Sequence, residues 1–252
     1  MKNFKKLNKI IGWLVFLIAT FVYLATMEKT ASLWDCGEFI SGAYKLEVVH
    51  APGAPLFLMM GRIFTLFATD VTQVAVMVNS MSALASSFTI LFLFWTITAF
   101  GRKIYFKNGE LEKSKIYAIL GAGIVGSLAY TFSDSFWFSA VEGEVYALSS
   151  FFTAVTFWCI MKWEEESDKP QASRWLVLIG YLIGLSIGVH LLSLLTIPAM
   201  GMIYYFKKYN YTKMGAIKAF ILLMVILGVV QGVIIPNAVS LISKFELFFV
   251  NT

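Results

Sequence analysis

The sequence predicts an all-α protein that crosses a membrane several times. Apolar residues make up 59% of the 252 positions and charged residues only 14%, a balance that soluble domains do not show. Long apolar runs recur along the chain, and each approaches the roughly 20 residues that an α-helix needs to cross the hydrocarbon core. We therefore expect a polytopic membrane protein with about seven transmembrane helices.

Five of these runs are long enough for one crossing each. They lie near 10–27, 75–99, 116–133, 145–163 and 217–236. A further apolar region, 175–206, is too long for one crossing and is interrupted around His190, so we expect two short helices that meet at a polar break. The first run is too long for a cleaved signal peptide, which favours a retained signal anchor.

Lysine and arginine residues lie mostly on one side of this predicted topology. Cationic flanking segments are retained on the cytoplasmic side of a membrane. With the N-terminus inside, the inner segments 1–9, 101–115, 162–174 and 207–218 hold sixteen of the twenty cationic residues. The four outer ones are Lys29, Lys45, Arg62 and Lys244. The sequence thus predicts a cytoplasmic N-terminus.

The chain is expected to form one membrane module over 1–252. It would have a cytoplasmic tail at 1–9, a large outer loop at 28–73 and an outer segment at 237–252. The net charge of +5 reflects topology and does not indicate nucleic-acid binding, which would need basic residues on one face. Cys36 and Cys159 are predicted on opposite sides of the membrane, so no disulfide is expected.

The outer loop places carboxylates directly after the first span. Asp35 precedes Glu38 by three residues, which is the spacing of a helix capping box and also places both side chains on one helical face. Pro52, Gly53 and Pro55 then predict a rigid bend. A second interfacial helix is expected at 56–67, with Arg62 extending towards the membrane surface.

Three segments resemble one family of membrane glycosyltransferases. Residues 35–57, "DCGEFISGAYKLEVVHAPGAPLF", resemble the D-S-G-E and H-P-P-G-x-P-L pattern of the bacterial DUF2723 family and its animal relative, the transmembrane protein 260 O-mannosyltransferases. "EVYALSSFF" at 144–152 and "GLSIGVHLL" at 184–192 resemble two later elements of that family, in the same order. The matching residues of the first segment are Asp35, Gly37, Glu38, His50, Pro52, Gly53, Pro55 and Leu56.

The sequence also departs from the family pattern. Cys36 stands where the family has serine, and Ala51 and Ala54 replace a proline and an aromatic residue. These differences concern contacts with the acceptor or the donor, whereas the acidic residues of the motif are retained. Family members continue with further spans and usually a soluble region. This sequence therefore resembles the N-terminal membrane module of the family, and whether the module acts alone is left open.

The resemblance implies a GT-C-type fold and a transfer reaction at the outer membrane face. A polyprenyl-phosphate-linked sugar would be the donor, and Ser or Thr of exported proteins the acceptor. We expect a protein of the bacterial inner membrane that contacts membrane lipid and, in one interpretation, the export machinery.

The resemblance also suggests roles for individual residues. Asp35 is expected to be the general base, with Glu38 positioning the acceptor or tuning Asp35, although these two assignments are interchangeable. His50 would bind the acceptor or brace the loop. His190 would contact the donor phosphate or satisfy a backbone carbonyl.

Other outer groups have two interpretations each. Glu142 and Glu144 would line the same cavity as the catalytic pair or lie in water as ordinary loop acids. Tyr146 is interpreted as part of an aromatic belt rather than a sugar platform. No metal ligands are assigned, although paired acids can hold a divalent cation.

The main alternative is a non-catalytic membrane subunit that works beside an export channel. A transporter would show repeated halves or charges near mid-membrane, and neither is visible in the sequence. Acids gathered around one outer cavity would favour the enzyme, and scattered acids would favour the subunit.

The predicted topology can be tested by accessibility labelling. A cysteine probe at position 47 should react with an impermeant reagent added from outside, whereas one at position 107 should not. The reverse pattern would overturn the orientation and the functional assignments that depend on it.

Overall fold

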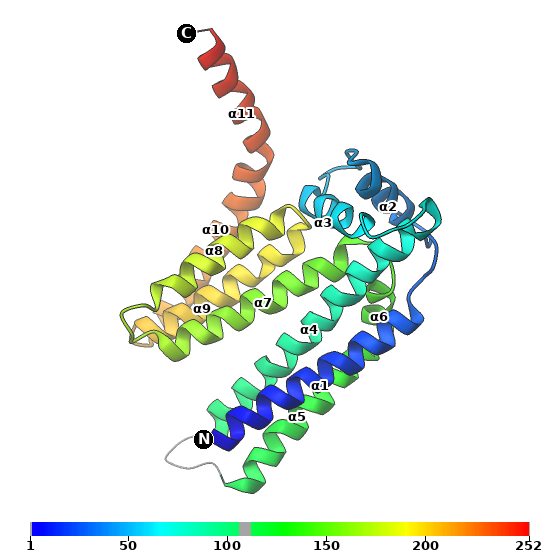
Figure 1. Ribbon diagram of the computed structural model, residues 1–252. Helices are drawn as coiled ribbons and strands as arrows, with labels where there is room; N and C mark the ends of the chain where they lie inside the picture. The colour runs from blue at the N-terminus through cyan, green and yellow to red at the C-terminus, as the bar shows by residue number, and fades with distance from the viewer. Residues whose placement is uncertain (1, 106–111, 252) are drawn as a thin grey trace. The chain divides into compact units, whose positions relative to one another are not determined.

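The computed structural model describes residues 2–105 and 112–251, and all regular secondary structure in those ranges is helical (Figure 1). The predicted all-α class is confirmed. The chain divides into two compact units, Met1–Ser193 and Leu194–Thr252, which are described separately. Part of the predicted inner segment 101–115, including Lys107, lies outside the described residues.

The first unit combines long and short helices. Its long helices are α1 (Lys2–Thr26), α4 (Val74–Tyr105), α5 (Lys113–Thr131) and α7 (Val145–Glu166). Its shorter helices are α2 (Cys36–Lys45), α3 (Pro55–Thr65), α6 (Asp134–Ala140) and α8 (Ser173–Ile187). Single 3₁₀ turns occupy Val71–Gln73 and Leu191–Leu195, and the latter leads into the second unit.

The second unit consists of α9 (Thr196–Lys208), α10 (Lys213–Val229) and α11 (Ile235–Val250). A π-helical segment, Val230–Ile234, joins the last two. α9 and α10 pack against each other.

The structure contains fewer clear spans than the seven expected. Within the described residues, four helical segments are long and apolar enough to cross a membrane: Asn3–Thr26, Val71–Tyr105, Val145–Glu166 and Lys213–Ala238. A fifth span is added if α5 and α6, which are bent by 68° at a short break, count as one. The region 175–206 is divided as expected, but α8 has 15 residues and α9 has 13, which is short for a full crossing. The protein is thus an integral membrane protein, with the count of seven not confirmed.

α4 is the central helix of the first unit and packs against α1, α5 and α7 (Figure 1). Small residues allow neighbouring backbones to come close. A Cβ added to Gly123 of α5, for example, would lie only 2.7 Å from Thr98 Cγ2. The buried hydroxyl of Ser87 donates to the Ala83 carbonyl at 2.8 Å, so this polar group is satisfied within its own helix.

The predicted pair of helices in the outer loop is present as α2 and α3, which pack against each other. Their backbones come close at Gly61, where an added Cβ would lie 2.8 Å from Ala43 Cβ. Arg62 does not simply extend towards the membrane surface, because its Nη1 donates to the Tyr44 carbonyl at 2.8 Å and its guanidinium lies over the Tyr44 ring. Arg62 therefore ties α3 to α2.

The α2–α3 hairpin rests on the N-terminal ends of α4 and α7. Phe39 and Phe57 of the hairpin belong to one buried apolar cluster with Val78 of α4 and Leu148 of α7. Burial of such side chains stabilises each by roughly 1.5–3 kcal/mol. The residues before and between α2 and α3 are thus held on a rigid platform.

Gly61→Ile should separate α2 from α3, because the new side chain has no room beside Ala43. Overpacking of this kind costs about 1–3 kcal/mol. Gly121→Ile in α5 is the matched control, since a Cβ there meets nothing within 4 Å. Thermal unfolding in detergent should show a lower midpoint for the first variant only, and equal midpoints would contradict the close packing of the hairpin.

Candidate active site

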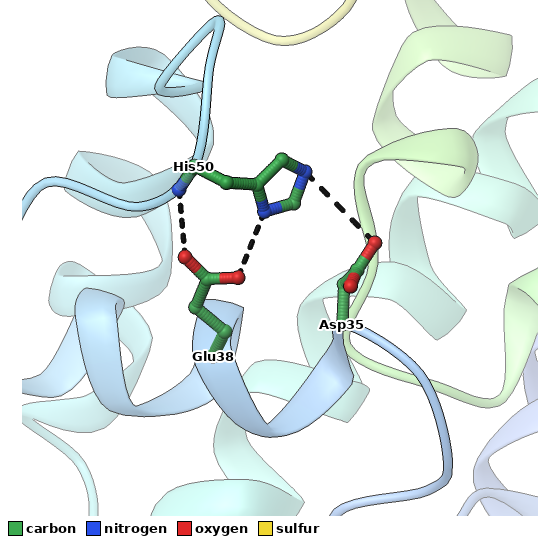
Figure 2. A group of neighbouring side chains, drawn as sticks. All are labelled: Asp35, Glu38 and His50. Atoms are coloured by element: carbon green, nitrogen blue, oxygen red, sulfur yellow. Dashed lines mark hydrogen bonds and ion pairs between the residues drawn. The ribbon is translucent and has the colours of Figure 1, made fainter.

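Asp35, Glu38 and His50 lie together at the start of the α2–α3 hairpin (Figure 2). Asp35 immediately precedes α2, Glu38 lies in its first turn, and His50 belongs to the loop that leads to α3. Glu38 contacts His50 twice: Oε1 accepts from the backbone N–H at 2.6 Å, and Oε2 lies 2.8 Å from Nδ1. On the other side of the ring, Nε2 is 3.9 Å from Asp35 Oδ2.

The loop backbone explains how His50 returns to α2. Leu46 ends α2 in the left-handed region with φ 56°, which turns the chain back. Gly53, with φ 90°, donates its N–H to the His50 carbonyl at 2.9 Å, and Pro55 then begins α3 at a position where its missing N–H costs nothing. The bend predicted from Pro52, Gly53 and Pro55 is therefore present.

The capping interpretation of the two carboxylates is wrong. Asp35 occupies the N-cap position, but its side chain makes no capping hydrogen bond. Glu38 does not reach back to the helix start, because both of its oxygens are engaged by His50. The two acids do share one end of the helix, with His50 between them.

The contact between Glu38 and His50 stabilises both charged forms. The hydrogen bond from the imidazole lowers the pKa of Glu38 below its ordinary value, and the same bond raises the pKa of His50. The contribution of Glu38 is present above its ordinary pKa of 4.5 and is lost as pH falls through the lowered value. That of His50 is present below 6.5 and is lost as pH rises through the raised value. The ion pair is thus fully formed between pH 4.5 and 6.5.

A cavity of about 150 Å³ lies beside this group. Its lining includes Asp35, His50, Glu144, Tyr146 and His190. Four of the six predicted site residues therefore share one cavity, and Glu38 borders it through His50. Tyr146, interpreted from sequence as an aromatic-belt residue, also lines the cavity and lies 5.4 Å from the His190 ring, centroid to centroid.

Glu142 and Glu144 have different surroundings although both are buried. Burial and then the nearby Glu142 raise the pKa of Glu144 to about 7, so a large share of Glu144 is protonated at neutral pH. Glu142 does not line the cavity, and its Oε2 lies 2.5 Å from Ser32 Oγ. Ser32 also lies 3.0 Å from Cys36 Sγ. Sequence reasoning missed Ser32, and no motif marked it.

His190 follows the break predicted in the apolar region, two residues after Gly188. Its backbone N–H donates to the Ser186 carbonyl at 2.9 Å, and its Nδ1 accepts from the Leu192 N–H at 3.1 Å. Burial lowers the pKa of His190, so the ring is neutral at physiological pH, with its proton on Nε2. His190 is therefore a hydrogen-bond donor rather than a cation.

Asp35, Glu38 and His50 lie close enough together to hold a cation. One ligand atom from each lies within 4.8 Å of the other two. Two carboxylates and an imidazole form a donor set that suits Mn²⁺ or Zn²⁺. The chemistry of these residues fits a divalent cation, although binding would compete with the hydrogen bond between Glu38 and His50.

Glu38→Gln should lower the pKa of His50 towards its ordinary value, because the carboxylate that stabilises the imidazolium is lost. The chain contains only two histidines, so NMR titration of their ring protons can follow each one. His190 is the internal control and should titrate unchanged. An unaltered His50 titration would contradict the ion pair.

Comparisons with known proteins place the chain in a family. The family model "Protein O-mannosyl-transferase TMEM260 N-terminal domain" matches residues 35–213, a stretch that contains all six predicted site residues. Two curated relatives are "Protein O-mannosyl-transferase tmem260" of Dictyostelium discoideum, 26% identical over 196 residues, and "Protein O-mannosyl-transferase TMEM260" of Mus musculus, 27% identical over 174 residues. No solved structure matches.

The matches cover 73% and 69% of this chain but 22% of each relative. The chain thus spans about a fifth of the length of the curated relatives that it matches. Because the family model spans well over half of the sequence and begins at Asp35 itself, the chain belongs to the TMEM260 N-terminal domain family.

Proposed function

We propose that this chain is the membrane module of a glycosyltransferase of the GT-C type. It would transfer a sugar, mannose by analogy with the names of its relatives, from a polyprenyl-phosphate donor to Ser or Thr of exported proteins. The observation that carries the proposal is the cavity that collects Asp35, His50, Glu144 and His190 beside Glu38.

Asp35 is the best-placed general base. Glu38 is engaged twice by His50, whereas the Asp35 carboxylate is half exposed and its nearest charged contact, His50 Nε2, is 3.9 Å away. In the proposed reaction the acceptor oxygen attacks the anomeric carbon, the bond from that carbon to the donor phosphate oxygen breaks, and the hydroxyl proton passes to Asp35. Glu38 acts through His50 as a positioning residue.

The remaining polar groups of the cavity suit the donor phosphate. His190 offers an Nε2–H donor, and Glu144, with a pKa of about 7, can hold a proton instead of a repelling charge. A divalent cation held by Asp35, Glu38 and His50 would supply positive charge for the same phosphate. The lipid-linked donor explains why this chemistry lies at the end of membrane-spanning helices.

The orientation rests on the distribution of cationic residues. Sixteen lysines and arginines on the predicted inner side support a cytoplasmic N-terminus, and with that orientation the cavity would lie at the extracytoplasmic face. The proposed location is the bacterial inner membrane. A non-catalytic subunit of the export machinery is less well supported, because the acids gather around one cavity instead of being scattered.

Asp35→Asn should abolish most transfer while leaving the fold intact, since the side chain makes no capping bond and is exposed. Loss of a general base commonly lowers the rate about 10²- to 10⁴-fold. Glu38→Gln should impair transfer less, because it acts through His50. The assay uses membranes from cells that express the natural gene product or one of its variants. A polyprenyl-phosphate mannose donor and a Ser/Thr peptide are added, and the transfer rate is normalised to the amount of folded protein.

Glu47→Gln is the matched control, because Glu47 is an exposed acid of the same loop that pairs only with Lys45 at 3.7 Å among the described residues. It should transfer at the unmodified rate. Unchanged turnover in Asp35→Asn would refute the catalytic assignment and favour the subunit interpretation.

A further inference from the structure

A second polar pocket lies at the opposite end of the first unit from the candidate active site. Its volume is about 350 Å³, and it is lined by the N-terminal turns of α1 and the C-terminal turns of α4 and α7. The active-site cavity lies beyond the other ends of these helices, and α1 alone spans about 37 Å at 1.5 Å per residue. The pocket is therefore independent of the proposed transfer reaction.

Four cations line this pocket, namely Lys5, Lys9, Arg102 and Lys162, together with two carboxylates, Glu165 and Glu166. Positive charge is thus in excess by two. The imbalance is greater in effect, because Glu166 is engaged by residues that do not line the pocket.

Glu165 is neutralised by two of the pocket cations. It forms an ion pair with Arg102, and its Oε2 lies 3.0 Å from Lys162 Nζ. Glu166 is turned to other partners: its Oε2 accepts from Trp175 Nε1 at 3.0 Å, and its Oε1 lies 3.3 Å from Lys169 Nζ. Neither carboxylate therefore balances the lysines of α1.

Lys5 and Lys9 lie one helical turn apart on the pocket face of α1. Both are exposed, and neither has an acidic partner within the described residues. Two unpaired ammonium groups on one face of a helix attract a multivalent or strongly anionic oxygen group.

The walls of the pocket indicate which anion it fits. Phe4, Trp95 and Trp158 line it beside the cations, and Lys162 lies over the Trp158 ring at 5.5 Å from its centroid. α1, α4 and α7 are all spans, so the pocket sits where their ends meet the membrane surface. Tryptophans beside cations at that level are typical of the headgroup region, and basic pockets between transmembrane helices bind anionic lipid headgroups.

We propose that this pocket, formed by Lys5, Lys9, Arg102 and Lys162 between α1, α4 and α7, binds the phosphate headgroup of an anionic glycerophospholipid. The two α1 lysines contact the phosphate oxygens, and the tryptophans contact the glycerol and the first methylenes of the acyl chains. The lipid thereby bridges α1 to α4 and α7.

The test measures lipid binding to the purified chain in a neutral maltoside detergent by native mass spectrometry and by thermal unfolding. Phosphatidylglycerol should bind and raise the unfolding midpoint, whereas phosphatidylcholine should do neither. Lys5→Gln with Lys9→Gln should weaken phosphatidylglycerol binding at least about tenfold, since each cation near an anionic headgroup contributes about 1 kcal/mol.

Lys6→Gln with Lys113→Gln is the matched control. It removes the same charge from the same end of the first unit, and neither residue lines the pocket. It should bind like the unmodified chain, and Lys5→Arg with Lys9→Arg should retain binding because both charges remain. Equal midpoints of the lipid-free variants would show that each one folds.

Three results would overturn the proposal. Equal binding of phosphatidylcholine would exclude a charge-selective site, and equal loss in the control pair would show that only overall charge matters. Protection by inorganic phosphate as strong as that by phosphatidylglycerol would identify a site for a free anion instead of a lipid.

Discussion

The double contact between Glu38 and His50 is the interaction on which the candidate active site depends. One carboxylate accepts from both the backbone and the ring of the same residue, so the position of the loop and the rotation of the imidazole are set together. Nε2 is consequently directed towards Asp35, whose Oδ2 lies 3.9 Å away. Without this contact, nothing would hold His50 of the proline-containing loop close to Asp35 and Glu38 at the start of the short helix.

The contact requires the rigid support below it. α2 and α3 are short helices, and short helices in isolation are marginally stable. Gly61 against Ala43, the link from Arg62 to the Tyr44 carbonyl and the shared apolar cluster with α4 and α7 fix the two helices as one body. The membrane-spanning helices thus position the site although they contribute few of its polar groups.

Much of this arrangement could be predicted from the sequence. Apolar runs indicated the main spans, and Asp35, Glu38 and the proline-containing bend marked the hairpin, because composition and turn chemistry are local properties. The number of spans could not be fixed, since whether α8 and α9 cross a membrane depends on partners and not on their hydropathy alone. The capping interpretation failed because His50, twelve residues away, engages Glu38 more favourably than the helix start does.

The sequence also could not predict how deeply individual side chains are buried. Glu142 and Glu144 are two residues apart, yet one contacts Ser32 and the other lines the cavity. The chain turns tightly between them, since the Glu144 N–H donates to the Glu142 carbonyl at 3.0 Å. The sequence left two roles open for His190, and burial together with the hydrogen bond that its Nδ1 accepts from the Leu192 N–H makes the ring neutral. These differences arise from tertiary packing, which cannot be inferred from the spacing of apolar residues in the sequence.

The carboxyl groups of the site have different surroundings and therefore different chemical roles. Asp35 is exposed and faces an imidazole, Glu38 is held in its ionised form by His50, and Glu144 is buried with a raised pKa. A proton on His50 and a divalent cation at the three-residue site would supply positive charge at the same place, and each disfavours the other by repulsion. The favourable interaction of Glu38 with protonated His50 therefore works against metal binding at acidic pH, and loss of that proton at higher pH removes the repulsion. If the site binds a cation, its metal-free and metal-bound states would be linked through the protonation of His50.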